Sequence, residues 1–132
     1  MDVYNVMVRY LVQVYLQSFF TKTSGDSFGK GEFYFKCNGK RYPDKGEFHL
    51  KAGQTFDPQP NPTFYTAIVD DKEKVVKFDF EAWEADPGRD DKFIDQKMNV
   101  NINPMNQTFE LTDKKQRCSL RIVVQVTPSD KW

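Results

Sequence analysis

The stretch VMVRYLVQVYL, residues 6–16, alternates between two kinds of position. Its even-numbered positions are all apolar or aromatic, whereas its odd-numbered positions include Arg9 and Gln13. Successive side chains of a β-strand point to opposite faces, while one face of a helix repeats every 3.6 residues. We therefore expect residues 6–16 to form a long strand with one apolar face.

Seven shorter segments with strand character follow this one. They cover residues 32–37, 46–50, 64–69, 75–83, 97–102, 107–111 and 119–126. Turn-forming pairs such as Asn38-Gly39 and Asn103-Pro104 separate them. The chain has 12 Phe and 6 Tyr, and such bulky side chains pack better on sheets than on helices. The pattern predicts an all-β fold, an antiparallel eight-stranded β-sandwich.

The length of 132 residues suits one domain with a single core. No internal repeat, low-complexity tract or change of composition divides the chain. We therefore expect one domain over residues 1–132, in which residues 127–132 form a short tail.

The charges of the chain cancel, with 19 basic and 19 acidic residues. A chain without net charge exerts little attraction on nucleic acid at a distance, so we expect no nucleic-acid partner. Polar residues such as Arg9, Gln13 and Gln17 interrupt the apolar N-terminal stretch, so we expect neither a signal peptide nor a transmembrane helix. These features predict a cytoplasmic protein.

The sequence offers little for catalysis. Cys37 and Cys118 lie far apart and neither belongs to a CxxC pair, so we expect two buried structural thiols. His49 is the single histidine, and no serine or cysteine nucleophile accompanies it in a recognisable triad pattern. The glycines near residue 29 do not form a phosphate-binding loop. We predict that the chain is not an enzyme and contains no catalytic residue.

Acidic residues concentrate between residues 70 and 95. This segment contains ten acidic and five basic residues. The centre of this segment, FEAWEADPGRDDKFI at residues 80–94, reads as a strand that enters an acidic loop and returns to a strand. Calcium takes about six to eight oxygen ligands in a flexible geometry, which closely spaced carboxylates can supply. The loop is therefore a candidate calcium site.

Two segments resemble the calcium loops of the C2 domain family. The first such loop typically reads Asp-x-x-Gly-Lys-Ser-Asp-Pro-Tyr-Val, and the segment DSFGKGEFYF, residues 26–35, matches it at Asp26, Gly29, Lys30, Glu32 and Tyr34. The third loop reads roughly Val-x-Asp-x-Asp followed by Asp-Asp-x-Ile-Gly, and here the corresponding residues are Trp83, Glu84, Asp86, Asp90, Asp91, Phe93 and Ile94. The resemblance implies a C2-like sandwich.

The resemblance also implies a Ca²⁺ site and a membrane-contacting surface. The implied ion ligands are Asp26, Glu32, Glu84, Asp86, Asp90 and Asp91. The implied membrane contacts are the apolar Phe28 and Phe93 and the basic Lys30, Arg89 and Lys92, which could meet lipid phosphates. The alternative is that Phe93 and Ile94 are core residues at the start of a strand and that Phe28 packs under its own loop.

Two further features are expected to be structural. The basic residues of a predicted hairpin are interspersed with Asp44 and Glu47, which is typical of a solvated face; they are Lys36, Lys40, Arg41, Lys45 and Lys51. Trp83 could serve as a stacking platform for a sugar or a base, but a tryptophan of this kind is more often part of a core.

Two functions from different classes follow. The first is a calcium-binding and phospholipid-binding C2-like module that acts as a peripheral membrane or adaptor domain. The alternative is an ion-independent structural or assembly sandwich, which docks protein partners through an exposed face or strand edge.

Overall fold

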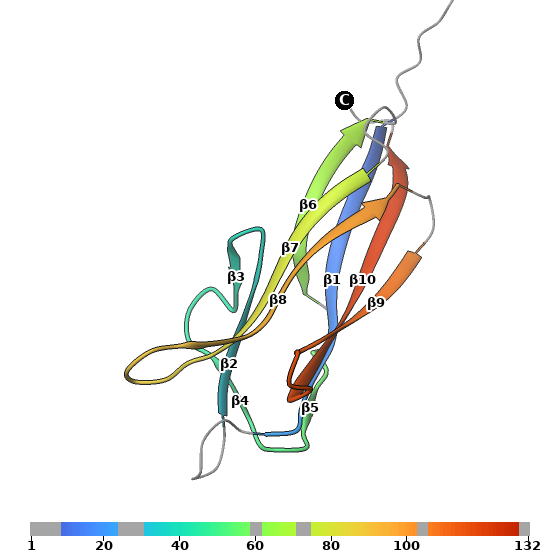
Figure 1. The fold of residues 1–132 in the computed structure, drawn as a ribbon. Helices are drawn as coiled ribbons and strands as arrows, with labels where there is room; N and C mark the ends of the chain where they lie inside the picture. Colours follow the sequence, from blue (N-terminus) through green and yellow to red (C-terminus); the bar gives the residue numbers. More distant parts are fainter. Residues whose placement is uncertain (1–8, 24–30, 59–61, 71–74, 103–105, 130–132) are drawn as a thin grey trace, which may run out of the picture.

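The computed structural model describes residues 9–23, 31–58, 62–70, 75–102 and 106–129, which form strands joined by loops (Figure 1). The ten strands of the described residues are β1 (Arg9–Thr21), β2 (Gly31–Cys37), β3 (Lys40–Tyr42), β4 (Phe48–Leu50), β5 (Thr55–Phe56), β6 (Thr63–Asp70), β7 (Val75–Glu84), β8 (Asp91–Asn101), β9 (Asn106–Thr112) and β10 (Cys118–Ser129). None of the described residues belongs to a helix with the length and hydrophobicity that crossing a lipid bilayer requires.

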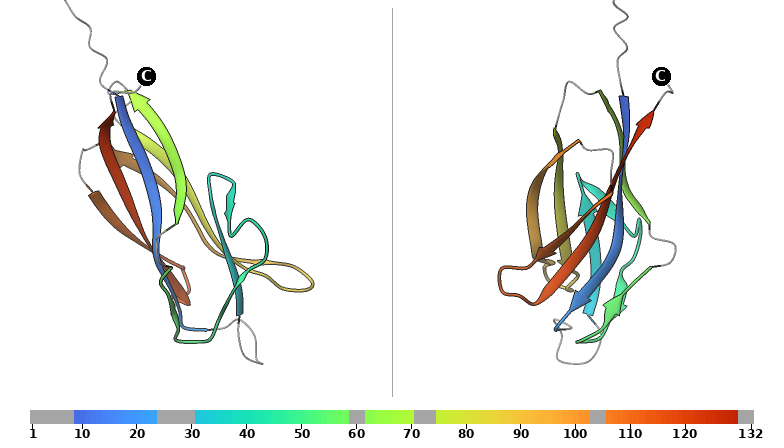
Figure 2. Two further views of the ribbon diagram at one scale, coloured as in Figure 1. Left: turned by 180° about the vertical axis from the view of Figure 1, so that it is seen from behind. Right: turned by 90° about the vertical axis from the view of Figure 1, so that its right-hand side faces the viewer.

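The strands form two antiparallel sheets that pack face to face, as the two views of Figure 2 show. Sheet A has the order β5-β1-β10-β9, and β6 also pairs with β1. Sheet B has the order β3-β2-β7-β8, and β4 also pairs with β2. The predicted all-β antiparallel sandwich is confirmed, with ten strands instead of the expected eight.

The core between the sheets is rich in phenylalanine. Phe19 of sheet A contacts Phe33 and Phe35 of sheet B, with ring centroids 5.2 and 4.9 Å apart. Phe64 of sheet A lies against Phe35 and Phe80 of sheet B, at 6.2 and 6.4 Å. Fully burying a side chain of this size stabilises a protein by about 1.5–3 kcal/mol relative to leaving it exposed. These rings join the two sheets.

Both cysteines are buried and free, as expected from the sequence. Burial in the apolar core raises the pKa of Cys37 and of Cys118 to about 12, because the thiolate would be poorly solvated there. Neither thiol is therefore ionised near neutral pH.

The largest differences from the sequence prediction concern five strands. β3 and β5 are only three and two residues long, too short to show an alternating pattern. β8 begins at Asp91 and not at residue 97, because most of its outward side chains are polar. β1 continues to Thr21 past an irregularity between Leu16 and Ser18, which shifts the alternation. β10 extends to Ser129, so residues 127–129, expected in a tail, pair with β1.

Candidate functional site

The outer face of sheet B carries aromatic and cationic side chains from four adjacent strands. The ladder places Lys36 opposite Arg41, Tyr34 opposite Trp83, and Trp83 opposite Lys92. Side chains that lie opposite each other on one face of a sheet are close enough to interact. We call these five residues, Arg41, Lys36, Tyr34, Trp83 and Lys92, the aromatic–cation row.

The members of the row stack on one another. The rings of Tyr34 and Trp83 are nearly parallel, with centroids 6.0 Å apart and planes inclined by 4°. The guanidinium carbon of Arg41 lies 4.1 Å from the centroid of the Tyr34 ring. The ammonium nitrogens of Lys36 and Lys92 lie 5.3 and 5.0 Å from the centroid of the Trp83 ring. Each of the three cations therefore lies within cation–π distance of a ring.

An irregularity in the β7–β8 ladder places Lys92 in the row. Ala82 pairs with Ile94, but the register shifts at the next residue, so that Trp83 pairs with Lys92. The shift also lets Phe93 and Ile94, two consecutive residues, both lie in the core. An extra residue of this kind is typical of a β-bulge, which redirects side chains without ending the strand.

A shallow cleft of about 670 Å³ adjoins the row at the hairpin between β7 and β8. Its lining includes Tyr34, Trp83, Arg89 and Lys92. The hairpin extends away from the two sheets, in yellow in Figure 1. Arg89 is exposed there, and no described residue forms an ion pair with it. The carboxylates of Asp90 and Asp91 complete the lining, so the cleft combines an aromatic wall with two cationic and two anionic groups.

Asp90 connects the hairpin to the row. The hydroxyl of Tyr34 donates to Oδ2 of Asp90 at 2.5 Å, and the backbone N–H of Asp86 donates to Oδ1 at 3.1 Å. These two bonds lower the pKa of Asp90 below its usual value. Burial, together with the same carboxylate, raises the pKa of Tyr34 to about 12. At neutral pH, Asp90 is therefore an anion with a donor on each oxygen, and Tyr34 is a neutral donor.

Replacing Tyr34 with Phe tests this connection. We expect the pKa of Asp90 to rise toward its ordinary value, and the free energy of unfolding at neutral pH to fall by about 1–2 kcal/mol, because a hydrogen bond to a charged group is lost. Because the pKa of Asp90 is lowered in the folded state, its contribution to stability is present at neutral pH and is lost as the pH falls through that pKa.

The measurement is an NMR titration of the Asp90 carboxylate, combined with urea unfolding. Tyr15→Phe is the matched control, since the described residues provide no hydrogen-bond partner for the hydroxyl of Tyr15. An unchanged Asp90 titration in Tyr34→Phe would contradict the assigned bond.

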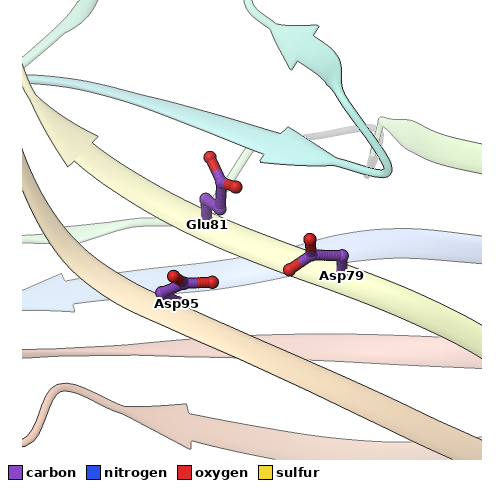
Figure 3. Close-up of side chains that lie close together, drawn as sticks. All are labelled: Asp79, Glu81 and Asp95. Carbon is purple, nitrogen blue, oxygen red and sulfur yellow. The ribbon is translucent and has the colours of Figure 1, made fainter.

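Three carboxylates lie close together beside the row, on β7 and β8 (Figure 3). They belong to Asp79, Glu81 and Asp95, and an oxygen from each lies within 4.8 Å of the others. We call this group the acidic triad. Glu81 accepts a hydrogen bond from the indole N–H of Trp83 at 2.7 Å, and the buried Oδ1 of Asp79 has no described hydrogen-bond partner.

Lys92 already supplies a positive charge to the acidic triad. Its ammonium nitrogen lies 3.2 Å from an oxygen of Asp95 and 3.9 Å from an oxygen of Glu81. The hydrogen bond to Asp95 raises the pKa of Lys92. The triad therefore holds Lys92 over the Trp83 ring from one side, which fixes a flexible side chain in the row.

The predicted calcium ligands are distributed over several environments. Asp26 lies outside the described residues. Glu32 lies on the outer face, with Oε1 3.8 Å from Nδ1 of the exposed His49. Glu84 is buried, with 4 % of its surface exposed, whereas Asp91 is exposed at the start of β8.

The loop between β7 and β8 uses its own carboxylates to stabilise its turn. Oδ1 of Asp86 accepts from the backbone N–H of Gly88 at 3.3 Å, and both oxygens of Asp90 have donors. Among the described residues, the only set of three potential ligands that converges is the acidic triad, which contains none of the predicted ligands. The described part of the predicted set therefore does not come together as one cluster of three ligands in this structure, and the calcium assignment stays a prediction.

The predicted membrane contacts are only partly placed on a surface. Arg89 and Lys92 are exposed and line the cleft, and Phe28 and Lys30 lie outside the described residues. The assignment of Phe93 to the membrane surface is wrong. Its side chain is 7 % exposed, and its ring packs between Phe33, at 6.0 Å, and the guanidinium of Arg117, at 3.8 Å. Phe93 and Ile94 are core residues, as the alternative interpretation stated.

Two expectations for single residues also change. Trp83 was expected in the core, but its strand partners place it on the outer face, where it is half-buried under lysine side chains. Arg41 and Lys36 were expected on a solvated face, but both lie against aromatic rings. The signal in the sequence was the alternation Tyr34-Phe35-Lys36, which places Tyr34 and Lys36 on one face.

No protein-family model matches the sequence, and a search of curated proteins found no relative. Solved structures do match over nearly the whole chain. A C2 domain of plant Extended Synaptotagmin 1 matches with a TM-score of 0.51 and 12 % identity, over 92 % of this chain and 96 % of that one. The chain has the C2 fold. The resemblance inferred from its loops is therefore confirmed at the level of the fold.

Two further solved structures match the chain, and the first of them is also a C2 domain protein. A C2 domain protein from Ramazzottius varieornatus matches with a TM-score of 0.54 and 10 % identity, over 92 % of this chain and 89 % of that one. Human GIVD cytosolic phospholipase A2 matches with a TM-score of 0.54 and 10 % identity, over 94 % of this chain and 17 % of that one. The chain thus matches only a small part of that larger protein.

Proposed function

We propose that this chain is a non-catalytic C2-like binding module that attaches to the phosphate groups of anionic lipid headgroups through the outer face of sheet B. The observation that carries the proposal is the aromatic–cation row, in which three cations lie over two stacked rings. Lys36 and Lys92 lie over Trp83, and Arg41 lies over Tyr34.

The chemistry of the row suits a phosphate group. Arginine and lysine donate charge-assisted hydrogen bonds to phosphate oxygens, and side chains that already lie against a ring lose less freedom on binding. Arg41 is also held by Glu47, at 2.9 Å, and by the carbonyl of Pro43, at 2.7 Å. The row is therefore ordered before a ligand arrives.

Charge balance supports a single headgroup as the ligand instead of a broad anionic surface. The chain has no net charge, and the acidic triad lies directly beside the row. Exposed charges are screened over about 8–10 Å at physiological ionic strength, so attraction by the row is local. A phosphate that enters the cleft would meet Arg89 and Lys92 directly, whereas a broad anionic surface would also meet the carboxylates of Asp90 and Asp91.

Vesicle sedimentation of the Lys36→Glu/Lys92→Glu variant tests the proposal. The vesicles are phosphatidylcholine with and without phosphatidylserine, and all samples contain a calcium chelator. We expect the wild type to sediment with the anionic vesicles, and the variant to lose about tenfold or more in affinity, since each basic residue near an anionic surface contributes about 1 kcal/mol.

The matched control is Lys40→Glu/Lys45→Glu, which makes the same charge change at exposed positions outside the row. Retained binding by the row variant would show that the row is not the attachment surface, and equal loss in both variants would show that general charge drives attachment. No sedimentation of the wild type with or without calcium would reject the lipid function and favour the assembly function.

Calcium-dependent attachment is the second candidate. It is favoured by the carboxylates of the β7–β8 hairpin together with Asp26 and Glu32. Sedimentation only in the presence of calcium, abolished by Asp86→Ala, would support this candidate. Because Asp90 already has two hydrogen-bond donors, we expect attachment in the chelator as well.

A further inference from the structure

A second cleft, of about 580 Å³, also borders β8 and shares Lys92 with the cleft beside the aromatic–cation row. One wall consists of residues 92–96 of β8, and the other consists of Thr112 at the end of β9 with residues 113–115 and 117 of the turn that follows. The cleft thus lies where an edge strand of sheet B approaches the end of sheet A. We call it the edge cleft.

The edge cleft runs along the backbone edge of β8. Successive residues of a strand point to opposite faces, so a cleft over one face would be lined by alternate residues only. Five consecutive residues of β8 line the edge cleft. Among the described residues, β8 pairs with β7 alone, from Asp91 to Asn101. One edge of β8 therefore has backbone N–H and C=O groups that no described strand uses.

Hydrogen bonds and a ring contact hold the opposite wall of the edge cleft. The buried carboxylate of Asp113 accepts from Nε of Arg117 at 2.5 Å and from a terminal nitrogen at 3.2 Å. The same guanidinium lies 3.8 Å from the centre of the Phe93 ring, which connects the turn to β8. These contacts hold the two walls at a fixed separation.

The charges of the edge cleft favour an acidic ligand. Four cationic side chains line it, against the two carboxylates of Asp95 and Asp113. Asp113 is paired with Arg117 and Asp95 is paired with Lys92. Lys114 and Lys115 are exposed and form no ion pair with any described residue. Two lysines therefore remain available to a ligand.

We propose that the edge cleft binds an extended acidic segment of a protein partner, which adds to β8 as a further strand of sheet B. Backbone hydrogen bonds to β8 would supply affinity, and Lys114 and Lys115 would select acidic side chains. An extended peptide matches alternating N–H and C=O groups along a strand edge, which a lipid headgroup or a free phosphate does not. This inference does not depend on the lipid-binding proposal, because Lys114 and Lys115, which would select the ligand, belong neither to the aromatic–cation row nor to the cleft beside it.

The test uses a capped, fluorescently labelled peptide of alternating glutamate and valine, about six residues long to span the edge at about 3.3 Å per residue. Fluorescence anisotropy measures its binding to the full chain, and NMR shifts locate it. We expect saturable binding with shifts in residues 92–96. Lys114→Glu/Lys115→Glu should weaken binding by about tenfold or more, whereas Lys40→Glu/Lys45→Glu should leave it unchanged.

Two further peptides separate strand addition from simple charge attraction. A peptide with lysine in place of glutamate should not bind, and a peptide with N-methyl groups on alternate residues should bind at least about tenfold more weakly. Equal binding of the N-methylated peptide, shifts confined to other residues, or no binding of the acidic peptide would each overturn the proposal. Loss of vesicle sedimentation in Lys114→Glu/Lys115→Glu with no peptide binding would assign the lysines to lipid instead.

Discussion

Phe35→Ala is expected to lower the free energy of unfolding by about 3–5 kcal/mol, the largest effect of any single truncation in this core. Phe35 is fully buried on β2, and its ring lies 4.9 Å from Phe19, 6.2 Å from Phe48 and 6.2 Å from Phe64. Phe19 and Phe64 belong to sheet A, so the ring joins both sheets. Its removal leaves a cavity that neither sheet can fill by a local shift.

Urea unfolding at neutral pH measures this loss. Phe35→Leu keeps most of the side-chain volume and should lose clearly less stability than Phe35→Ala. Ile68→Ala is the surface control, because Ile68 is the exposed large apolar residue of the described chain, at 55 %, and truncation there should cost within about 0.5 kcal/mol. A similar loss for Phe35→Ala and Ile68→Ala would mean that the ring does not join the sheets.

The sandwich could be predicted because a strand that buries one face has an apolar residue at every second position of its sequence. Val12, Val14 and Leu16 of β1 are all fully buried, as their alternation indicated. The pattern fails where the backbone is irregular or the strand is polar. Past Leu16 the alternation shifts, and no residue of β8 between Ile94 and Val100 is buried. Neither feature produces an apolar period that a sequence pattern can detect.

The candidate site was only partly predictable, since it depends on register between strands. The sequence placed Glu84, Asp86, Asp90 and Asp91 near one loop, but the hydrogen bonds that occupy Asp90 include one from Tyr34, which is 56 residues away. The aromatic–cation row requires Trp83 to lie opposite both Tyr34 and Lys92. That arrangement depends on the register shift between Ala82 and Trp83 in the β7–β8 ladder. No residue pattern in the sequence predicts this shift.

Asp113→Ala is expected to lower the free energy of unfolding by about 2–3 kcal/mol at neutral pH. The carboxylate is buried and accepts three hydrogen bonds from Arg117, two from its guanidinium and one from its backbone N–H, at 3.2 Å. Its removal leaves Arg117 without its partner. Because the Arg117 side chain is 31 % exposed, water can solvate part of the guanidinium, which keeps the loss below that of a fully buried pair.

The pH dependence of this loss identifies the charge of Asp113 as its cause. Burial alone would raise the pKa of Asp113, but the hydrogen bonds from Arg117 outweigh it and lower the pKa below its ordinary value. A lowered pKa in the folded state means that the stabilisation is complete above the unfolded pKa of about 4 and declines as the pH falls through the folded pKa. The difference between wild type and Asp113→Ala in urea unfolding should therefore shrink below about pH 4. The control is Glu110→Ala, which removes an exposed ion pair with Arg121 at 3.2 Å and should lower the free energy of unfolding little at any pH. If the loss of stability in Asp113→Ala instead stays constant below about pH 4, packing and not charge is its cause.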